Sequence, residues 1–197
     1  MPSGLKSVTL IELLIAIMLL AVVILAINNI DIFSRYQSTS SEQRTKVQND
    51  IARCLEHITK NAANTIGNEE IYGTNTTVYI SPDSANTAIL SFFTDTNGNG
   101  TRDAGGGDYW VSYNYNTTGH TFSYCNQCPN AACAACSGSE EILARDITGF
   151  SASKDFTKGN HINITIAACW DPAKACDISN PGFNMTTAVI LPSVSTN

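Results

Sequence analysis

The sequence predicts an α+β protein in which one long N-terminal helix is followed by an antiparallel β-sheet. Three observations support this fold class. Residues 8–30 are apolar almost without interruption, and residues 31–66 contain no proline or glycine that would end a helix. From residue 67 to residue 197 the pattern changes to short β-branched and aromatic segments, which are separated by turns rich in Gly, Asn and Asp.

The first segment, residues 8–30, is long enough to cross a membrane, because about 20 apolar helical residues span a hydrocarbon core of about 30 Å. Glu12 is the one charged residue in this segment. An ionised side chain in lipid costs a few kcal/mol unless it is paired. We therefore expect a functional role for Glu12, with a positively charged amino terminus as its partner. The alternative is an uncleaved signal anchor that carries the acid by chance.

The second segment, residues 31–66, is predicted to continue the helix as an amphipathic helix. Its apolar residues recur at spacings of three and four. They form one stripe: Val47, Ile51, Cys54, Leu55 and Ile58. We expect the helix to run from Val8 to about Lys60, with Gly67 as its stop signal.

The remaining segment, residues 67–197, is predicted to be a globular head whose antiparallel sheet packs on the stripe. The candidate strands alternate polar and apolar residues or are rich in β-branched and aromatic residues. They are residues 77–80, 88–93, 109–115, 121–124, 142–147 continuing into 148–152, 161–167 and 187–191. The expected arrangement is one antiparallel meander.

Charge and cysteine content limit the possible functions. Only 14% of the residues are charged, and the formal net charge is -6. Binding of nucleic acid through its phosphates needs a basic patch, so the net charge argues against a nucleic-acid-binding protein. Only nucleic-acid binding at a local basic patch stays open. Six of the seven cysteines follow residue 124. In a chain of this size they indicate an oxidising compartment such as a periplasm or a cell surface.

The cysteines form a dense cluster and a separate pair. The cluster contains two Cys-x-x-Cys motifs, Cys125/Cys128 and Cys133/Cys136, and Cys169 and Cys176 enclose a short loop that they can close with a bond between them. Structural disulfides are favoured. Zinc is the less favoured alternative, because ordinary zinc ribbons separate their pairs by more residues, and redox catalysis lacks a thioredoxin-like layout. Cys54 is expected to be a small apolar core residue.

The segment that begins at Asp95 resembles the first nine positions of a calcium-binding loop. Such loops place oxygen ligands at alternate positions and a glycine at the sixth. The expected ligands are Asp95, Asn97, Asn99, Thr101 through its carbonyl group, Asp103 and, in place of the missing twelfth-position glutamate, Asp108. So few carboxylates imply a dissociation constant on the order of 10⁻⁴ to 10⁻³ M. The alternative is a Gly- and Asn-rich hairpin turn that needs no metal.

Catalytic patterns are not found in the sequence. His57, His120 and His161 are widely separated, and no zinc-protease, serine-hydrolase or phosphate-loop motif occurs. We therefore expect the protein not to be an enzyme.

The stretch from Lys6 to Leu14, KSVTLIELL, resembles the processing site of type IV prepilins and pseudopilins. In that family a prepilin peptidase removes a short leader, the new terminus is methylated, and an acid at the fifth mature position offsets the terminal charge of a neighbouring subunit. Carried over to this chain, the leader is residues 1–7, cleavage falls between Ser7 and Val8, and Glu12 is the fifth mature residue. Ser7 stands where most members have Gly, and Val8 where most have Phe. The close resemblance covers residues 6–30.

The resemblance implies a pilin-like fold, with the transmembrane first half of the helix leading into a β-sheet head. It implies a structural subunit of a type IV pilus, with a minor pilin favoured, and a looser likeness over the head extends to the J-type minor pseudopilins of type II secretion systems. The expected partners are other pilins or pseudopilins, the prepilin peptidase and the inner membrane. The head is expected in the periplasm before assembly and in a cell-surface filament afterwards. An adhesin or DNA-binding head is a further alternative, for which an exposed patch of Tyr109, Trp110, Tyr113 and Tyr115 would be evidence.

Overall fold

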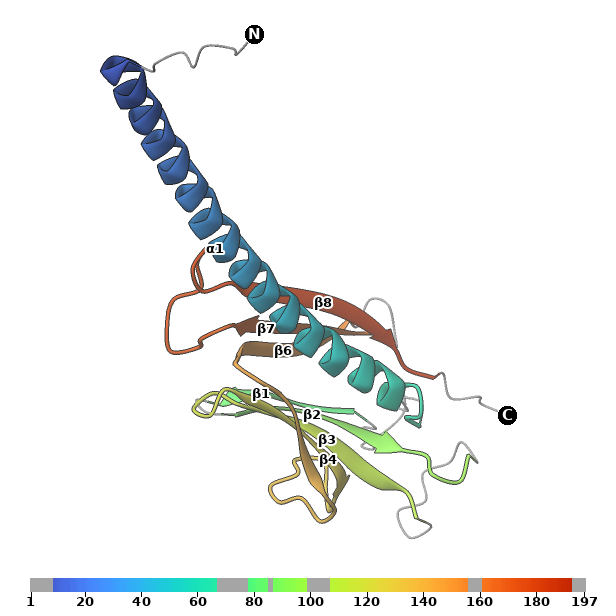
Figure 1. Ribbon diagram of the computed structural model, residues 1–197. Helices are drawn as coiled ribbons and strands as arrows, with labels where there is room; N and C mark the ends of the chain where they lie inside the picture. Colours follow the sequence, from blue (N-terminus) through green and yellow to red (C-terminus); the bar gives the residue numbers. More distant parts are fainter. Residues whose placement is uncertain (1–8, 67–77, 85–86, 99–106, 156–160, 193–197) are drawn as a thin grey trace. The chain divides into compact units, whose positions relative to one another are not determined.

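The computed structural model describes residues 9–66, 78–84, 87–98, 107–155 and 161–192. These residues form one long helix and two antiparallel sheets (Figure 1). The elements are α1 (Leu10–Ala62), β1 (Val78–Ser84), β2 (Thr87–Thr94), β3 (Tyr109–Asn116), β4 (Thr121–Cys128), β5 (Glu140–Arg145), β6 (Ile147–Asp155), β7 (His161–Cys169) and β8 (Gly182–Ile190). The predicted α+β layout is therefore present. The chain divides into two compact units, Met1–Glu42 and Gln43–Asn197.

Helix α1 runs without interruption from Leu10 to Ala62, close to the predicted bounds. It ends in a tightened turn, in which Asn64 N donates to Asn61 O at 3.1 Å and Thr65 N donates to Ala62 O at 3.2 Å. Such bonds satisfy carbonyl groups that the end of a helix leaves without partners. The predicted stop signal, Gly67, lies outside the described residues.

The strands form two sheets, which corrects the expectation of one meander. The first sheet has the order β1-β2-β3-β4-β5 and the second the order β6-β7-β8. The predicted run over residues 142–152 is divided at Asp146, whose φ of 64° is left-handed, a conformation that Asp tolerates better than most residues. Ile147 N donates to His120 O and Cys169 N donates to Asp146 O, each at 3.1 Å. The chain thus leaves the first sheet at Arg145 and begins the second at Ile147.

The main hydrophobic core joins the predicted stripe of α1 to both sheets. All five stripe residues are buried, which confirms the periodicity argument. Their neighbours in the core include Leu90, Phe92, Tyr113 and Phe122 of the first sheet and Ile162, Ile164 and Ile166 of the second. The rings of Phe122 and Phe150, one from each sheet, have centroids 5.0 Å apart. Burial on this scale makes the unit Gln43–Asn197 a single packed head.

A smaller core lies on the other face of the first sheet, which we call the outer face. Its buried members are Ile66, Phe93, Trp110, Cys125, Cys128 and Cys133. The rings of Phe93 and Trp110 meet edge to face with centroids 5.2 Å apart. Because side chains alternate between the faces of a strand, Trp110 and Val111 belong to different cores.

Candidate functional site

The apolar half of α1, residues 10–30, exposes apolar side chains in every direction. Each of its large apolar residues is at least 50% exposed, from Leu14 and Ile24 at 50% to Leu10 at 83%. This part of the helix is long and apolar enough to cross a membrane. Soluble proteins rarely expose apolar patches larger than a few hundred Å². The surface therefore needs lipid or protein to cover it.

Glu12 is held at the first turn of the helix by Thr9. Its Oε2 accepts hydrogen bonds from Thr9 N and Thr9 Oγ1, both at 2.9 Å, and Glu12 N donates to Thr9 Oγ1 at 3.4 Å. This reciprocal arrangement is a capping box, which satisfies two backbone donors at the start of a helix. This role was not among the expectations for Glu12, although the Thr-x-x-Glu spacing indicates it. Glu12 thus has a local partner in the single chain, while Ser7 and Val8 lie outside the described residues.

The last turns of α1 contact the first sheet through a small polar network. Tyr113 Oη donates to His57 O at 3.0 Å and accepts from Asn61 Nδ2 at 2.8 Å, and His57 Nδ1 lies 2.9 Å from the same hydroxyl. Burial raises the pKa of Tyr113 and lowers that of His57. Burial, with a contribution from Asp50, also raises the pKa of the Cys54 thiol to about 12. Cys54 is free and buried in the main core, which confirms the expected small apolar core residue.

The candidate calcium loop is described at its two ends. Asp95 Oδ1 accepts from Gly98 N at 2.7 Å, and Gly98 has a φ of 72°. Asp108 is buried, and its Oδ1 accepts from both Thr96 N and Thr96 Oγ1 at 3.0 Å. These bonds hold the two described ends of the segment through its own side chains, which is the kind of contact that the metal-free alternative requires. Asn97 is also described, but three of the expected ligands lie outside the described residues: Asn99, Thr101 and Asp103. Calcium binding therefore stays a prediction.

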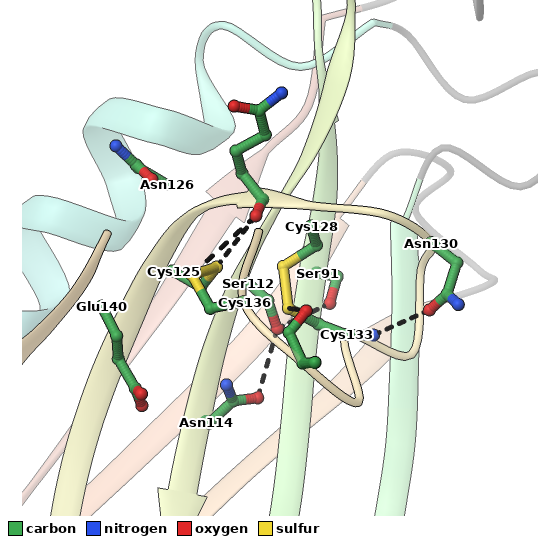
Figure 2. The surroundings of a disulfide bond; sticks show 12 residues. Ser91, Ser112, Asn114, Cys125, Asn126, Cys128, Asn130, Cys133, Cys136 and Glu140 are labelled. Atoms are coloured by element: carbon green, nitrogen blue, oxygen red, sulfur yellow. Dashed lines mark hydrogen bonds between the residues drawn. A yellow bond between two sulfur atoms is a disulfide. The ribbon is translucent and has the colours of Figure 1, made fainter. Parts of the chain in front are cut away.

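The six clustered and paired cysteines form three disulfides, which confirms the favoured interpretation. Cys125 is bonded to Cys136, Cys128 to Cys133, and Cys169 to Cys176 (Figure 2 shows the first two). The Sγ atoms of Cys125, Cys128 and Cys133 lie within 4.8 Å of one another. A thiolate metal site needs free thiolates, so the zinc alternative applies only to a reduced form.

The Cys169–Cys176 disulfide belongs to an ordered loop that follows β7. The side chain of the buried Asn180 accepts from Asp171 N at 2.8 Å and donates to Asp171 O at 2.8 Å and Ala175 O at 3.1 Å. Lys46 of α1 places its Nζ 4.8 Å from the ring centroid of Trp170, a cation–π contact. The loop is therefore held both internally and against the helix.

The aromatic residues of β3 do not form the exposed patch that an adhesive head would need. Trp110, Tyr113 and Tyr115 are buried, and Tyr109 is half-buried. Tyr113 and Tyr115 belong to the main core, whereas Trp110 belongs to the smaller core on the outer face. The expected evidence for an aromatic binding surface on this strand is therefore not found.

Comparison of the chain with protein-family models, with curated proteins and with solved structures yields no match.

Proposed function

We propose that this chain is a membrane-anchored structural subunit of a filament of the type IV pilus class, which includes the secretion pseudopilus. One observation carries the proposal. A single continuous helix is apolar on all sides over residues 10–30 and buries one stripe over residues 47–62. The first part needs lipid or other helices around it, whereas the second part is already covered by the head.

The apolar half supports two successive environments. Before assembly, a helix satisfies all its backbone groups internally and is therefore stable in lipid. After assembly, the same surface packs against the helices of neighbouring subunits, because all its sides are apolar. Burial in lipid and packing among many helices both need a surface of this kind. The KSVTLIELL resemblance adds the removal of the leader as the step between the two environments.

Glu12 has two roles in this proposal, which are separable by substitution. In the single chain it completes a capping box with Thr9. In the filament its negative charge attracts the methylated amino terminus of a neighbouring subunit. Glutamine also completes a capping box but carries no charge, so Glu12→Gln removes only the second role.

Processing provides the first test. Mass spectrometry of the protein from its native host should detect a methylated Val8 as the first residue. Co-expression with a prepilin peptidase in a heterologous host should shorten the precursor by residues 1–7. A precursor that keeps these residues in the native host contradicts the proposal.

Filament incorporation provides the second test. Glu12→Gln should leave the protein in the membrane fraction but reduce its incorporation into sheared filaments. Thr9→Ser, which keeps the hydroxyl group of the cap, is the matched control and should be incorporated as the native chain is. If Glu12→Gln assembles normally while Thr9→Ala does not, Glu12 acts through its cap alone and the charge-pairing role is wrong.

A further inference from the structure

The outer face of the first sheet carries a pocket of about 500 Å³. This volume lies within the range of about 300 to 1,000 Å³ that is typical of small-molecule sites. Its floor is a row of residues that are paired across four adjacent strands. In this row Ile89 pairs with Asn114, Asn114 with Ser123, and Ser123 with Ile142. The floor is thus polar at its centre and apolar at both ends.

The Asn114 side chain of the floor is held by the neighbouring row of the sheet, in which Ser91 pairs with Ser112 and Ser112 with Cys125. Ser91 Oγ donates to Ser112 Oγ at 2.9 Å, and Ser112 Oγ donates to Asn114 Oδ1 at 3.3 Å (Figure 2). Ser91 and Ser112 are fully buried. Because the amide oxygen of Asn114 accepts from Ser112, its NH₂ group is the part that remains for a ligand.

The same pocket also contains an acceptor. Glu140 of β5 is exposed, and its Oε1 accepts from the buried Ser123 Oγ at 2.8 Å. Asn116 Oδ1 accepts from Thr118 N at 3.0 Å and Gly119 N at 2.9 Å, which again leaves an NH₂ group. Among the described residues, no protein group accepts a hydrogen bond from the Nδ2 of Asn114 or of Asn116. The pocket therefore presents amide donors and a carboxylate acceptor.

The wall of the pocket is the cysteine loop, residues 129–135, which contributes Cys133 and Ala134. The loop is closed by two disulfides. Cys133 has a left-handed φ of 43°, and its N donates to both the carbonyl O and the Oδ1 of Asn130. At the base of the loop, Ser137 N donates to Gln127 O at 2.9 Å, and Ser139 N donates to Asn126 Oδ1 at 2.8 Å. The wall is thus fixed before a ligand arrives, which lowers the entropy cost of binding.

The composition of the pocket selects one class of ligand. Among the described residues that line it, none is basic, so phosphates, sulfates and nucleic acids lack a partner. A peptide strand that adds to a sheet needs an unpaired strand edge. Three of the four strands under the pocket, β2, β3 and β4, are paired on both sides, and the edge strand β5 is open only on the side away from β4. An apolar ligand would leave the amide groups and the carboxylate that line the pocket desolvated without hydrogen bonds.

We propose that this pocket binds a neutral saccharide. Each sugar hydroxyl group both donates and accepts, so the hydroxyl groups of a saccharide can pair with the Asn114 amide as well as with the Glu140 carboxylate. The Ile89 and Ile142 side chains at the ends of the floor suit the C–H faces of the sugar rings. This site is separate from the apolar half of α1, and it does not depend on filament assembly.

The test uses the full chain in a polyoxyethylene-ether detergent, since maltoside and glucoside detergents carry the ligand chemistry themselves. The probes are neutral mono- to tetrasaccharides, sialylated and sulfated saccharides, and alkylamines, each measured by saturation-transfer NMR and calorimetry. At least one neutral saccharide should bind, and the charged probes should bind more weakly. Asn114→Asp removes the amide donor, and Glu140→Gln removes the negative charge of the acceptor, each with little change in shape. Each substitution should weaken binding about tenfold.

Two matched controls locate the binding site. Glu141→Gln changes the neighbouring acid, which lies on the other face of the sheet and pairs with Arg53 at 3.4 Å. Asn163→Asp changes an exposed residue on β7 of the second sheet. Both should leave the affinity unchanged. The proposal is overturned if no neutral saccharide binds at tens of millimolar concentration. Such a concentration would saturate even a weak site with a dissociation constant of about 1 mM. It is also overturned if the sialylated or sulfated saccharides or the alkylamines bind more tightly than the neutral saccharides. The same holds if Glu141→Gln and Asn163→Asp weaken binding as much as the pocket variants do.

Discussion

The apolar half of α1, residues 10–30, and the docked part, residues 47–62, differ in how they satisfy their apolar side chains. Ile17 is 58% exposed, whereas Ile58 is fully buried in the main core. The docked part repeats its apolar residues at helical spacing, so one stripe faces the sheets and the polar residues face water. The apolar half has no polar side.

This difference shows what covers the apolar surface of each part. A stripe can be covered by the chain's own strands, and burial of such a stripe contributes about 25 cal/mol per Å² of apolar area. A surface that is apolar all round cannot be covered by one sheet, so it needs a surrounding medium. In lipid that medium is the hydrocarbon, and in a filament it is a set of neighbouring helices.

The largest expected effect comes from making the same substitution in both parts. Ile58→Ala removes fully buried atoms and leaves a cavity, and we expect it to lower the free energy of unfolding of the head by about 2 to 5 kcal/mol. Ile17→Ala removes the same atoms from an exposed position and should leave the unfolding of the head unchanged. Urea unfolding of both variants in detergent, followed by tryptophan fluorescence, measures the difference. Equal effects would contradict the assignment of the two parts.

A charge in the middle of the apolar half should have the next largest effect. Leu20→Arg costs about 3 kcal/mol for membrane insertion on translocon scales, so the membrane-bound fraction should fall sharply. Ser38→Arg, at an exposed position beyond the apolar half, is the matched control and should stay in the membrane fraction. Carbonate extraction of membranes, with circular dichroism of the purified proteins, separates failed insertion from failed folding. Retention of Leu20→Arg would show that the apolar half is not the anchor.

A smaller effect is expected where the docked part meets the sheet through polar groups. Tyr113→Phe keeps the ring in the core but removes the hydroxyl group that bonds His57 O and Asn61 Nδ2. The loss should be about 1 to 2 kcal/mol, because two buried partners lose their hydrogen bonds. Tyr79→Phe, which removes a hydroxyl group from half-buried Tyr79 on the edge strand β1, is the comparison and should have a lesser effect on the urea midpoint.

Much of the fold follows from local patterns in the sequence. The stripe of α1 and most strands were predictable, because spacings of 3.6 and 2 residues report which side of an element is buried. The division into two sheets was not, since it depends on the left-handed conformation of the single residue Asp146. A residue-type preference at one position is too weak a signal to divide a run of strand-forming residues.

The candidate sites were predictable to different degrees. The three disulfides follow from the number and spacing of the cysteines, but the pairing of Cys125 with Cys136 around Cys128–Cys133 needs the three-dimensional structure. The pocket on the outer face could not be predicted. Asn114, Ser123 and Glu140 come from three strands, and they meet only through the strand register.

The smallest expected effect is the pH dependence of the contact between the docked part and the sheet. His57 faces Tyr113 and Tyr124, whose rings lie 5.8 and 4.6 Å from its own ring, with Asn61 at 3.2 Å. Burial lowers the pKa of His57; Glu141 of β5 opposes this shift, whereas Lys60 and Arg53 on the same helix add to it.

A base whose pKa is lowered by folding binds more protons when unfolded, so stability rises with pH over that range. The head should keep its full stability above the unfolded value of about 6.5 and lose some as the pH falls through that value towards the folded pKa. The loss should be smaller than that caused by Tyr113→Phe, because His57 is only half-buried. In urea unfolding at pH 7.5 and pH 5.0, His57→Gln should reduce the change between the two pH values, whereas His161→Gln on β7 should not. If both variants behave as the native chain does, His57 is not the group that senses pH at this contact.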